Sequence, residues 1–131
     1  MFQISKDFTF SASHQLSGLP DGHQCGRLHG HNYTVRLELV SLDRDLLPVG
    51  FVMDYGELKP FGRYLDNRLD HRHLNEVFDF NPTAELMARA LYRVAVSELV
   101  LPQGVDVTAV SVSETAKTWA TYRPSLDAET R

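Results

Sequence analysis

The sequence predicts a single α+β domain in which an antiparallel four-stranded sheet carries two helices on one face. Three observations predict this class: segments in which apolar and polar residues alternate, segments with apolar residues at helical spacing, and the order β-β-α-α-β-β, which requires no parallel crossover. With 131 residues and 43% hydrophobic composition, the chain is large enough for one core. No repeat or linker divides it, so we expect one domain over residues 1–123 and a polar tail over residues 124–131.

Two segments near the N-terminus have the period of two that is typical of half-buried strands. They span residues 2–12 and 33–39, and a long loop with glycines and a proline separates them. The apolar faces comprise Phe2, Ile4, Phe8, Phe10 and Ala12 in the first segment and Tyr33, Val35, Leu37 and Leu39 in the second. We expect two strands that each bury one face.

The middle of the chain has apolar residues at helical spacing in two segments. Asp54 and Glu57 resemble a capping pair, which predicts a first helix that ends near Leu69. Asn81 as the cap and Pro82 at the first helical position predict the start of the second. The predicted apolar stripes are Leu58, Phe61, Leu65 and Leu69 in the first helix and Leu86, Ala90, Leu91, Val94 and Leu99 in the second.

Two further strands, over residues 105–114 and 119–123, complete the predicted sheet. The short link between them, residues 115–117, indicates a hairpin. A four-stranded sheet has two open edges, which are costly to leave unpaired. Pairing of these edges with other subunits would close a barrel, so we expect an oligomer.

Composition excludes several classes of function. The net charge is −4 and there is no basic run, which argues against general nucleic-acid binding. No apolar run approaches the roughly 20 residues of a membrane-spanning helix, and the N-terminus lacks the pattern of a signal peptide. The single cysteine, Cys25, excludes an intrachain disulfide. We expect a soluble, cytoplasmic protein with no membrane partner.

Three histidines are in phase for a metal site. His14 continues the apolar face of the first strand, and His29 and His31 lie two residues apart at the entry to the second. Three neutral imidazoles suit Zn²⁺ and leave a fourth position open for water or substrate. The alternative is that they are separate loop or core histidines. His23 and His73 are out of phase and are interpreted as ordinary surface or loop residues.

Cys25 has two functional interpretations. It could be a fourth ligand that closes a structural metal site, or a free thiolate beside the metal. A third interpretation is a small buried hydrophobe. The surrounding loop is rich in glycine and polar residues, unlike a core, and this favours a catalytic use.

Two further groups could carry chemistry. Asp70 and His71 could form a proton relay, in which a carboxylate orients an imidazole, although a histidine near a helix C-terminus also interacts favourably with the helix dipole. Glu114 shares a strand face with Val110 and Val112. It is either a surface charge at a strand end or a buried anchor for the adjacent amino and ring N–H groups of a pterin or guanine.

Five segments occur in the order seen in the 6-pyruvoyl-tetrahydropterin synthase family, which the chain resembles from about residue 2 to residue 123. The segments are residues 8–14 (FTFSASH), 25–31 (CGRLHGH), 69–71 (LDH), 81–85 (NPTAE) and 113–115 (SET). The short gap between Cys25 and His29 resembles the bacterial branch, the 6-carboxy-5,6,7,8-tetrahydropterin synthases of queuosine biosynthesis.

The resemblance implies the tunnelling fold (T-fold), in which three subunits share one barrel and two such trimers stack as a homohexamer with sites at subunit interfaces. It implies one Zn²⁺ per chain, held by His14, His29 and His31. The implied substrate is 7,8-dihydroneopterin triphosphate, and the implied products are 6-carboxytetrahydropterin, acetaldehyde and triphosphate.

The resemblance also implies roles for individual residues. Cys25 is the general base, Asp70 and His71 are its relay, and Glu114 anchors the pterin ring and can join the proton relay.

The sequence leaves the triphosphate-binding residues and several alternative functions open. Arg27 and Lys117 are candidates for binding the triphosphate by charge alone. The alternatives to the carboxy-forming synthase are a pyruvoyl-forming synthase that only eliminates triphosphate, a non-enzymatic structural-zinc module, and a pterin- or purine-binding protein without turnover.

Overall fold

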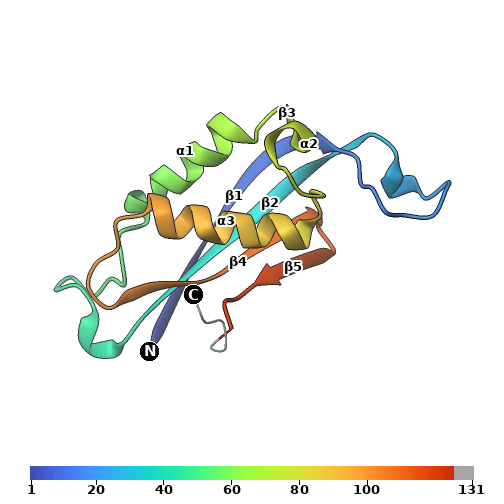
Figure 1. Ribbon diagram of the computed structural model, residues 1–131. Coiled ribbons are helices and arrows are strands. Elements are labelled where there is room, and N and C mark those ends of the chain that lie inside the picture. The colour runs from blue at the N-terminus through green and yellow to red at the C-terminus, as the bar shows by residue number, and fades with distance from the viewer. Residues whose placement is uncertain (126–131) are drawn as a thin grey trace.

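A computed structural model describes residues 1–125 of the chain, and the predicted polar tail lies outside the described residues from residue 126 onward. One sheet with the strand order β3-β1-β2-β4-β5 carries the helices on one face (Figure 1). The strands are β1 (Phe2–His14), β2 (His29–Ser41), β3 (Arg72–His73), β4 (Val105–Thr115) and β5 (Thr118–Tyr122). The helices are α1 (Lys59–Arg68), α2 (Leu74–Val77) and α3 (Ala84–Glu98), with short 3-10 turns at Gln24–Gly26, Asp43–Asp45 and Tyr55–Leu58.

The two long N-terminal strands form the antiparallel ladder that the alternating pattern predicts. The ladder runs from the pair Phe2–Ser41 to the pair His14–His29. Phe10 and Tyr33, which are also paired, are both buried under the helices, and their rings stack with centroids 4.8 Å apart. The predicted inward phase of both strands is therefore confirmed, except that Phe2 at the start of β1 is exposed.

A short fifth strand corrects the expected four-stranded antiparallel sheet. Helix α1 ends at Arg68, and the N–H groups of Leu69 and Asp70 both bond to the carbonyl of Leu65. His71 then adopts a left-handed conformation with φ 60°, which turns the chain out of the helix. The next two residues form β3, which pairs in parallel with β1 at Ala12 and Ser13. The sheet is mixed because this turn returns the chain alongside β1.

The first helix is buried as predicted, although it is not α-helical throughout. Asp54 accepts a hydrogen bond from the N–H of Gly56 at 2.8 Å and caps a 3-10 turn that leads into α1. All four residues of the predicted stripe are buried: Leu58, Phe61, Leu65 and Leu69.

The second predicted helix begins later than expected. Thr83, and not Asn81, caps α3 by accepting a hydrogen bond from the N–H of Leu86 at 3.2 Å. The buried residues of α3 are Met87, Ala88, Leu91 and Ala95, so the predicted stripe was partly wrong, and Leu86, Ala90 and Val94 are only half-buried. The shift leaves the Asn81 side chain available for contacts outside the helix.

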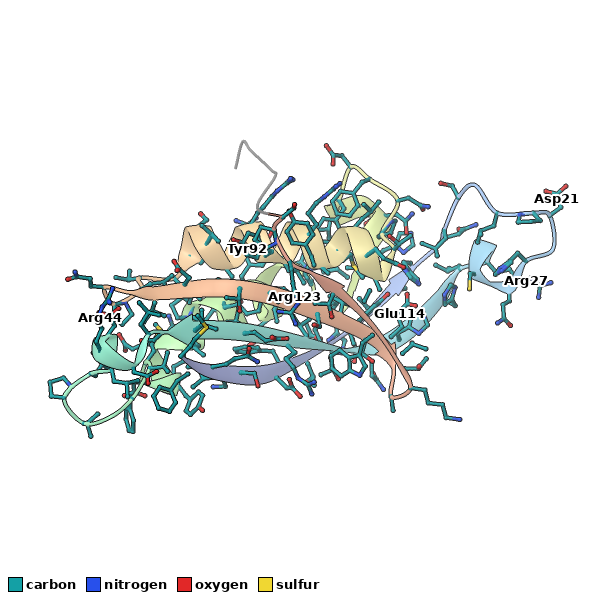
Figure 2. The ribbon with its side chains drawn as sticks, turned by 90° about the horizontal axis from the view of Figure 1, so that it is seen from below. Asp21, Arg27, Arg44, Tyr92, Glu114 and Arg123 are labelled. Carbon is teal, nitrogen blue, oxygen red and sulfur yellow. The ribbon has the colours of Figure 1, made fainter. Side chains whose placement is uncertain are left out.

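The face of the sheet opposite the helices is polar (Figure 2). Arg36 forms an ion pair with Asp7 at 2.8 Å, and its guanidinium lies 4.5 Å from the centre of the Trp119 ring. The sheet is not closed within one chain, since β3 and β5 are its two edges. Barrel closure by other subunits stays a prediction. Within residues 1–125, no helix combines the length and apolar character needed to cross a membrane.

Candidate metal centre and adjoining cleft

The three histidines predicted to hold a metal lie together at one end of the β1–β2 ladder. His14 and His29 are direct partners across the two strands, and His31 is paired with Ala12 on the same ladder. Because side chains two residues apart share a face, all three imidazoles project to the helix-covered side. One ring nitrogen from each lies within 4.8 Å of the corresponding nitrogens of the other two. The group can bind a metal ion.

Backbone carbonyls orient two of these rings. Nδ1 of His14 lies 2.9 Å from the carbonyl oxygen of Pro82, and Nδ1 of His29 lies 2.6 Å from that of Arg27. A carbonyl accepts only, so each Nδ1 carries the proton and each Nε2 presents a lone pair. The two Nε2 atoms are 3.0 Å apart, a separation that requires a proton or a cation between them. Nε2 of His31 is buried and has no hydrogen-bond partner among residues 1–125. This donor set fits a metal ion that prefers imidazole nitrogen.

Burial favours the neutral form of these ligands. Desolvation lowers the pKa of His14 and of His31 below the ordinary value of 6.5, although the nearby Glu114 carboxylate acts in the opposite direction. Burial also raises the pKa of Tyr33, whose hydroxyl lies 3.2 Å from Nδ1 of His14. At neutral pH, His14 and His31 are therefore neutral imidazoles, as metal binding requires.

Glu114 lies near the end of β4 (Figure 2), close to the histidine group. Its Oε2 lies 3.5 Å from Nε2 of His14 and 3.8 Å from Nε2 of His31. The carboxylate also lines a pocket of about 190 Å³ next to Trp119 and Glu85. It is thus a partly buried charge between the metal group and a small pocket, and not a free strand-end charge.

Asp70 and His71 form the predicted carboxylate–imidazole pair. Nδ1 of His71 lies 2.8 Å from Oδ2 of Asp70, and Oδ1 of Asp70 accepts a hydrogen bond from the N–H of Ser11 at 2.9 Å. The hydrogen bond from Ser11, and then that from His71, lower the pKa of Asp70. His71 and His31 both line an open cleft of about 480 Å³. The cleft therefore connects His71 with His31, one of the three clustered histidines.

Cys25 lies on a loop that projects from the sheet, in a 3-10 turn at Gln24–Gly26. It is half-buried, and its thiol makes no hydrogen bond to Asp70 or His71 within residues 1–125. Among residues 1–125, the group of side chains that could hold a metal ion does not include its sulfur. The exposed Arg27 lies on the same loop, whereas Lys117 is exposed in the β4–β5 turn. Neither Arg27 nor Lys117 lines the cleft of about 480 Å³ or the pocket of about 190 Å³.

Sequence reasoning missed several contributors to this region. His23 accepts a hydrogen bond from the N–H of Cys25 at 3.1 Å and caps its turn. His73 lies 3.0 Å from the hydroxyl of Ser13 and lines the cleft beside His71. A histidine two residues before a cysteine is a weak capping signal. No signal in the sequence indicates the parallel pairing of β3 that places His73.

The lowered histidine pKa values predict a pH-dependent stability of the metal-free protein. The unfolded chain binds protons as the pH falls through 6.5, but His14 and His31 resist protonation in the folded state. The free energy of unfolding should therefore decrease between 6.5 and the lower folded-state pKa values. Urea denaturation at several pH values would measure this dependence. His31→Gln should make it shallower, and an identical slope in that variant would contradict the assignment.

Comparisons with known proteins agree with this geometry. Residues 3–125 match the family model described as 6-pyruvoyl tetrahydropterin synthase. A 6-carboxy-5,6,7,8-tetrahydropterin synthase of Bacillus subtilis is 30% identical over 131 residues, covering 94% of this chain and 86% of that protein. The protein of the same name from Synechocystis is 34% identical over 126 residues and covers 93% of each chain. The structure of Caenorhabditis elegans 6-pyruvoyl tetrahydropterin synthase matches with a TM-score of 0.79 at 27% identity, covering 95% of this chain and 96% of that chain.

Proposed function

The chain belongs to the 6-pyruvoyl tetrahydropterin synthase family, and we propose that it is a 6-carboxy-5,6,7,8-tetrahydropterin synthase of queuosine biosynthesis. The reaction consumes one water molecule and converts 7,8-dihydroneopterin triphosphate to 6-carboxytetrahydropterin, acetaldehyde and triphosphate. The relatives of that name at 30% and 34% identity support the branch. The observation that carries the proposal is the convergence of three imidazole nitrogens beside Glu114 and next to the cleft of His71.

The proposed cofactor is one Zn²⁺ per chain, with His14, His29 and His31 as its ligands. Such an ion would supply Lewis-acid polarisation of the hydroxyls on the substrate side chain. The carbonyls of Pro82 and Arg27 keep two of the rings oriented for this purpose. A lone cysteine in a protein of this kind is compatible with the reducing cytoplasm, where we place the enzyme.

The remaining residues have distinct proposed roles. Cys25, as a thiolate, takes the proton from the side-chain carbon next to the ring imine. Asp70 holds His71 by a charge-assisted hydrogen bond, so that the imidazole can move protons between positions. Glu114 accepts two hydrogen bonds from the pterin amino and ring N–H groups, and can join the proton relay. Arg27 and Lys117 stay candidates for the triphosphate.

No hydrogen bond joins Cys25 to the Asp70–His71 pair within residues 1–125. A relay between them requires movement of the loop or a second subunit, and we propose the second. The open edges of the sheet and the family resemblance both support a hexamer of two trimers.

The proposed hexamer can be tested by measuring the mass of the protein in solution. Light scattering should report a mass far above the 14.8 kDa of one chain. If the site spans two subunits, mixing inactive Cys25→Ala and His71→Ala chains should restore roughly a quarter of the sites by random association. The unmixed variants are the control. A monomer at micromolar concentration would contradict both parts of this prediction.

The Glu114→Gln variant should bind substrate more weakly while it keeps its metal. Loss of the charge-assisted hydrogen bonds from the pterin to the carboxylate leaves the pterin N–H groups without a charged acceptor. Such a loss typically costs about 2–5 kcal/mol in binding free energy. Isothermal titration with a non-reactive pterin and metal analysis would measure the two effects. Glu85→Gln is a matched control, because Glu85 lines the same pocket but is exposed in the first turn of α3. Equal affinity in the Glu114→Gln and wild-type proteins would show that Glu114 does not bind the pterin.

Product analysis tests the proposed reaction. Incubation with 7,8-dihydroneopterin triphosphate, followed by mass analysis of all products, should detect acetaldehyde. Formation of triphosphate without acetaldehyde would instead identify the pyruvoyl-forming activity, which the name of the C. elegans structure makes the second candidate. Absence of any turnover would favour a binding or structural-zinc role.

A further inference from the structure

The loop that carries Cys25, residues 15–28, is held by hydrogen bonds and not by packing. Its residues are exposed except for Leu16, Cys25 and Gly26, which are half-buried. Gly18 and Gly22 have φ angles of 83° and 85°, in the region that favours glycine. A segment with few buried contacts opens easily, so its position depends on the polar contacts that it makes.

Two asparagines outside the loop supply these contacts. The Asn75 carboxamide accepts from the N–H of Gln15 at 2.9 Å and donates to its carbonyl at 2.8 Å. The Asn81 carboxamide accepts from the N–H of Ser17 at 3.0 Å and donates to its carbonyl at 3.1 Å. Each side chain thus satisfies both backbone groups of one residue, as a paired strand would. Within residues 1–125, these four bonds are the hydrogen bonds that join the loop to residues beyond its flanking strands.

Residues 15 and 16 also form hydrogen bonds to the turn that contains Cys25. The N–H of Leu16 donates to the carbonyl of Cys25 at 3.1 Å, and Nε2 of Gln15 donates to the carbonyl of Gly26 at 2.9 Å. Backbone groups alternate in direction along an extended chain, so residues 15 and 17 face the asparagines while residue 16 faces Cys25. Hydrogen bonds therefore connect the two asparagines to residues 15–17, and residues 15–17 to the turn that contains Cys25.

The two asparagines belong to the elements that carry the rest of the site. Asn75 lies in α2, four residues after His71, and Asn81 directly precedes Pro82, whose carbonyl orients His14. We propose that Asn75 and Asn81 are positioning residues, which place the Cys25 thiol relative to the metal ligands through the backbone of residues 15–17. This inference rests on the proposed function, in which Cys25 is the base.

The test uses the full-length, metal-loaded protein and the variants Asn75→Ala and Asn81→Ala. Misplacement of a reacting group by about 1 Å can cost on the order of 10²-fold in rate. We expect kcat to fall by about that factor in each variant, with KM and zinc content unchanged. In the Cys25→Ala background, the same changes should cause no further loss, because the asparagines act through Cys25. Asn81→Asp keeps the acceptor and replaces the donor, and should also lower kcat.

Two measurements report on the loop without any substrate. Amide hydrogen exchange at Gln15 and Ser17, and the alkylation rate of Cys25 by iodoacetamide, should both change in the variants. Asn67→Ala is the control, since the exposed Asn67 side chain makes no hydrogen bond within residues 1–125. It should match the wild-type protein in every measurement.

Three outcomes would overturn the inference. The first is unchanged amide exchange and unchanged Cys25 alkylation in both alanine variants. The second is loss of zinc together with activity. The third is a loss of rate in the Cys25→Ala background equal to the loss that the same changes cause in the wild-type background. A wild-type protein without turnover would refute the proposed function instead, because exchange and alkylation would still report whether the asparagines fix the loop.

Discussion

The Cys25→Ala protein is expected to keep its zinc, its oligomeric state and its substrate binding while losing about 10²–10⁴-fold in turnover. The three histidine nitrogens form a group without the Cys25 sulfur, so removal of the thiol leaves the metal ligands intact. The thiol is instead proposed to remove a proton in the reaction. Steady-state kinetics, metal analysis and light scattering on the same preparation would separate these effects.

Variants of the relay provide the comparison for Cys25. Asp70→Asn and His71→Ala should impair turnover in the same direction, because Asp70 fixes His71 through its 2.8 Å contact. The double variant of Cys25 and His71 should be little worse than Cys25→Ala, since members of one relay act as a unit. If Cys25→Ala loses zinc while the histidines remain, the thiol is a ligand and the structural-zinc reading is favoured. Slow alkylation of Cys25 in the metal-loaded protein would indicate the same.

The His29→Ala protein is expected to lose metal and activity together. His29 supplies the Nε2 atom that lies 3.0 Å from that of His14, so its removal leaves two nitrogens where a zinc site needs three protein ligands. Metal analysis after gel filtration and the turnover rate are the two measurements. His73→Ala is a matched control for metal content alone, because His73 is close to β1 but outside the group of ligand atoms. A metal content near one per chain in His29→Ala would contradict the assignment.

The sequence by itself predicted the group of three histidines that could hold a metal ion. The period of two in β1 and β2 requires that His14, His29 and His31 share a face, since one strand out of phase would bury polar side chains. The same pattern determined which face of the sheet the helices cover. These features follow from local periodicity and burial, which a single sequence carries along its length. Adjacency of Asp70 and His71 in the chain only suggested their pairing, and the 2.8 Å contact between them is seen in the structure.

Other features depended on contacts between segments that are distant in sequence. The left-handed turn at His71 and its bond to the carbonyl of Ser11 decided that β3 pairs with β1. Thr83, and not Asn81, caps α3, and the Asn81 side chain bonds to the backbone of Ser17 instead. Both residues are good helix caps, so intrinsic preference alone does not distinguish them.

Only the tertiary structure placed the chemical groups relative to one another. It set Glu114 within 3.5 Å of Nε2 of His14 and brought the carbonyl of Pro82 to the other nitrogen of that ring. Periodicity specifies the face on which a side chain lies, but the distance to its partner depends on strand register, helix position and loop anchoring. Those are properties of the packed chain, because each one is selected by the burial and hydrogen bonding of all the segments together.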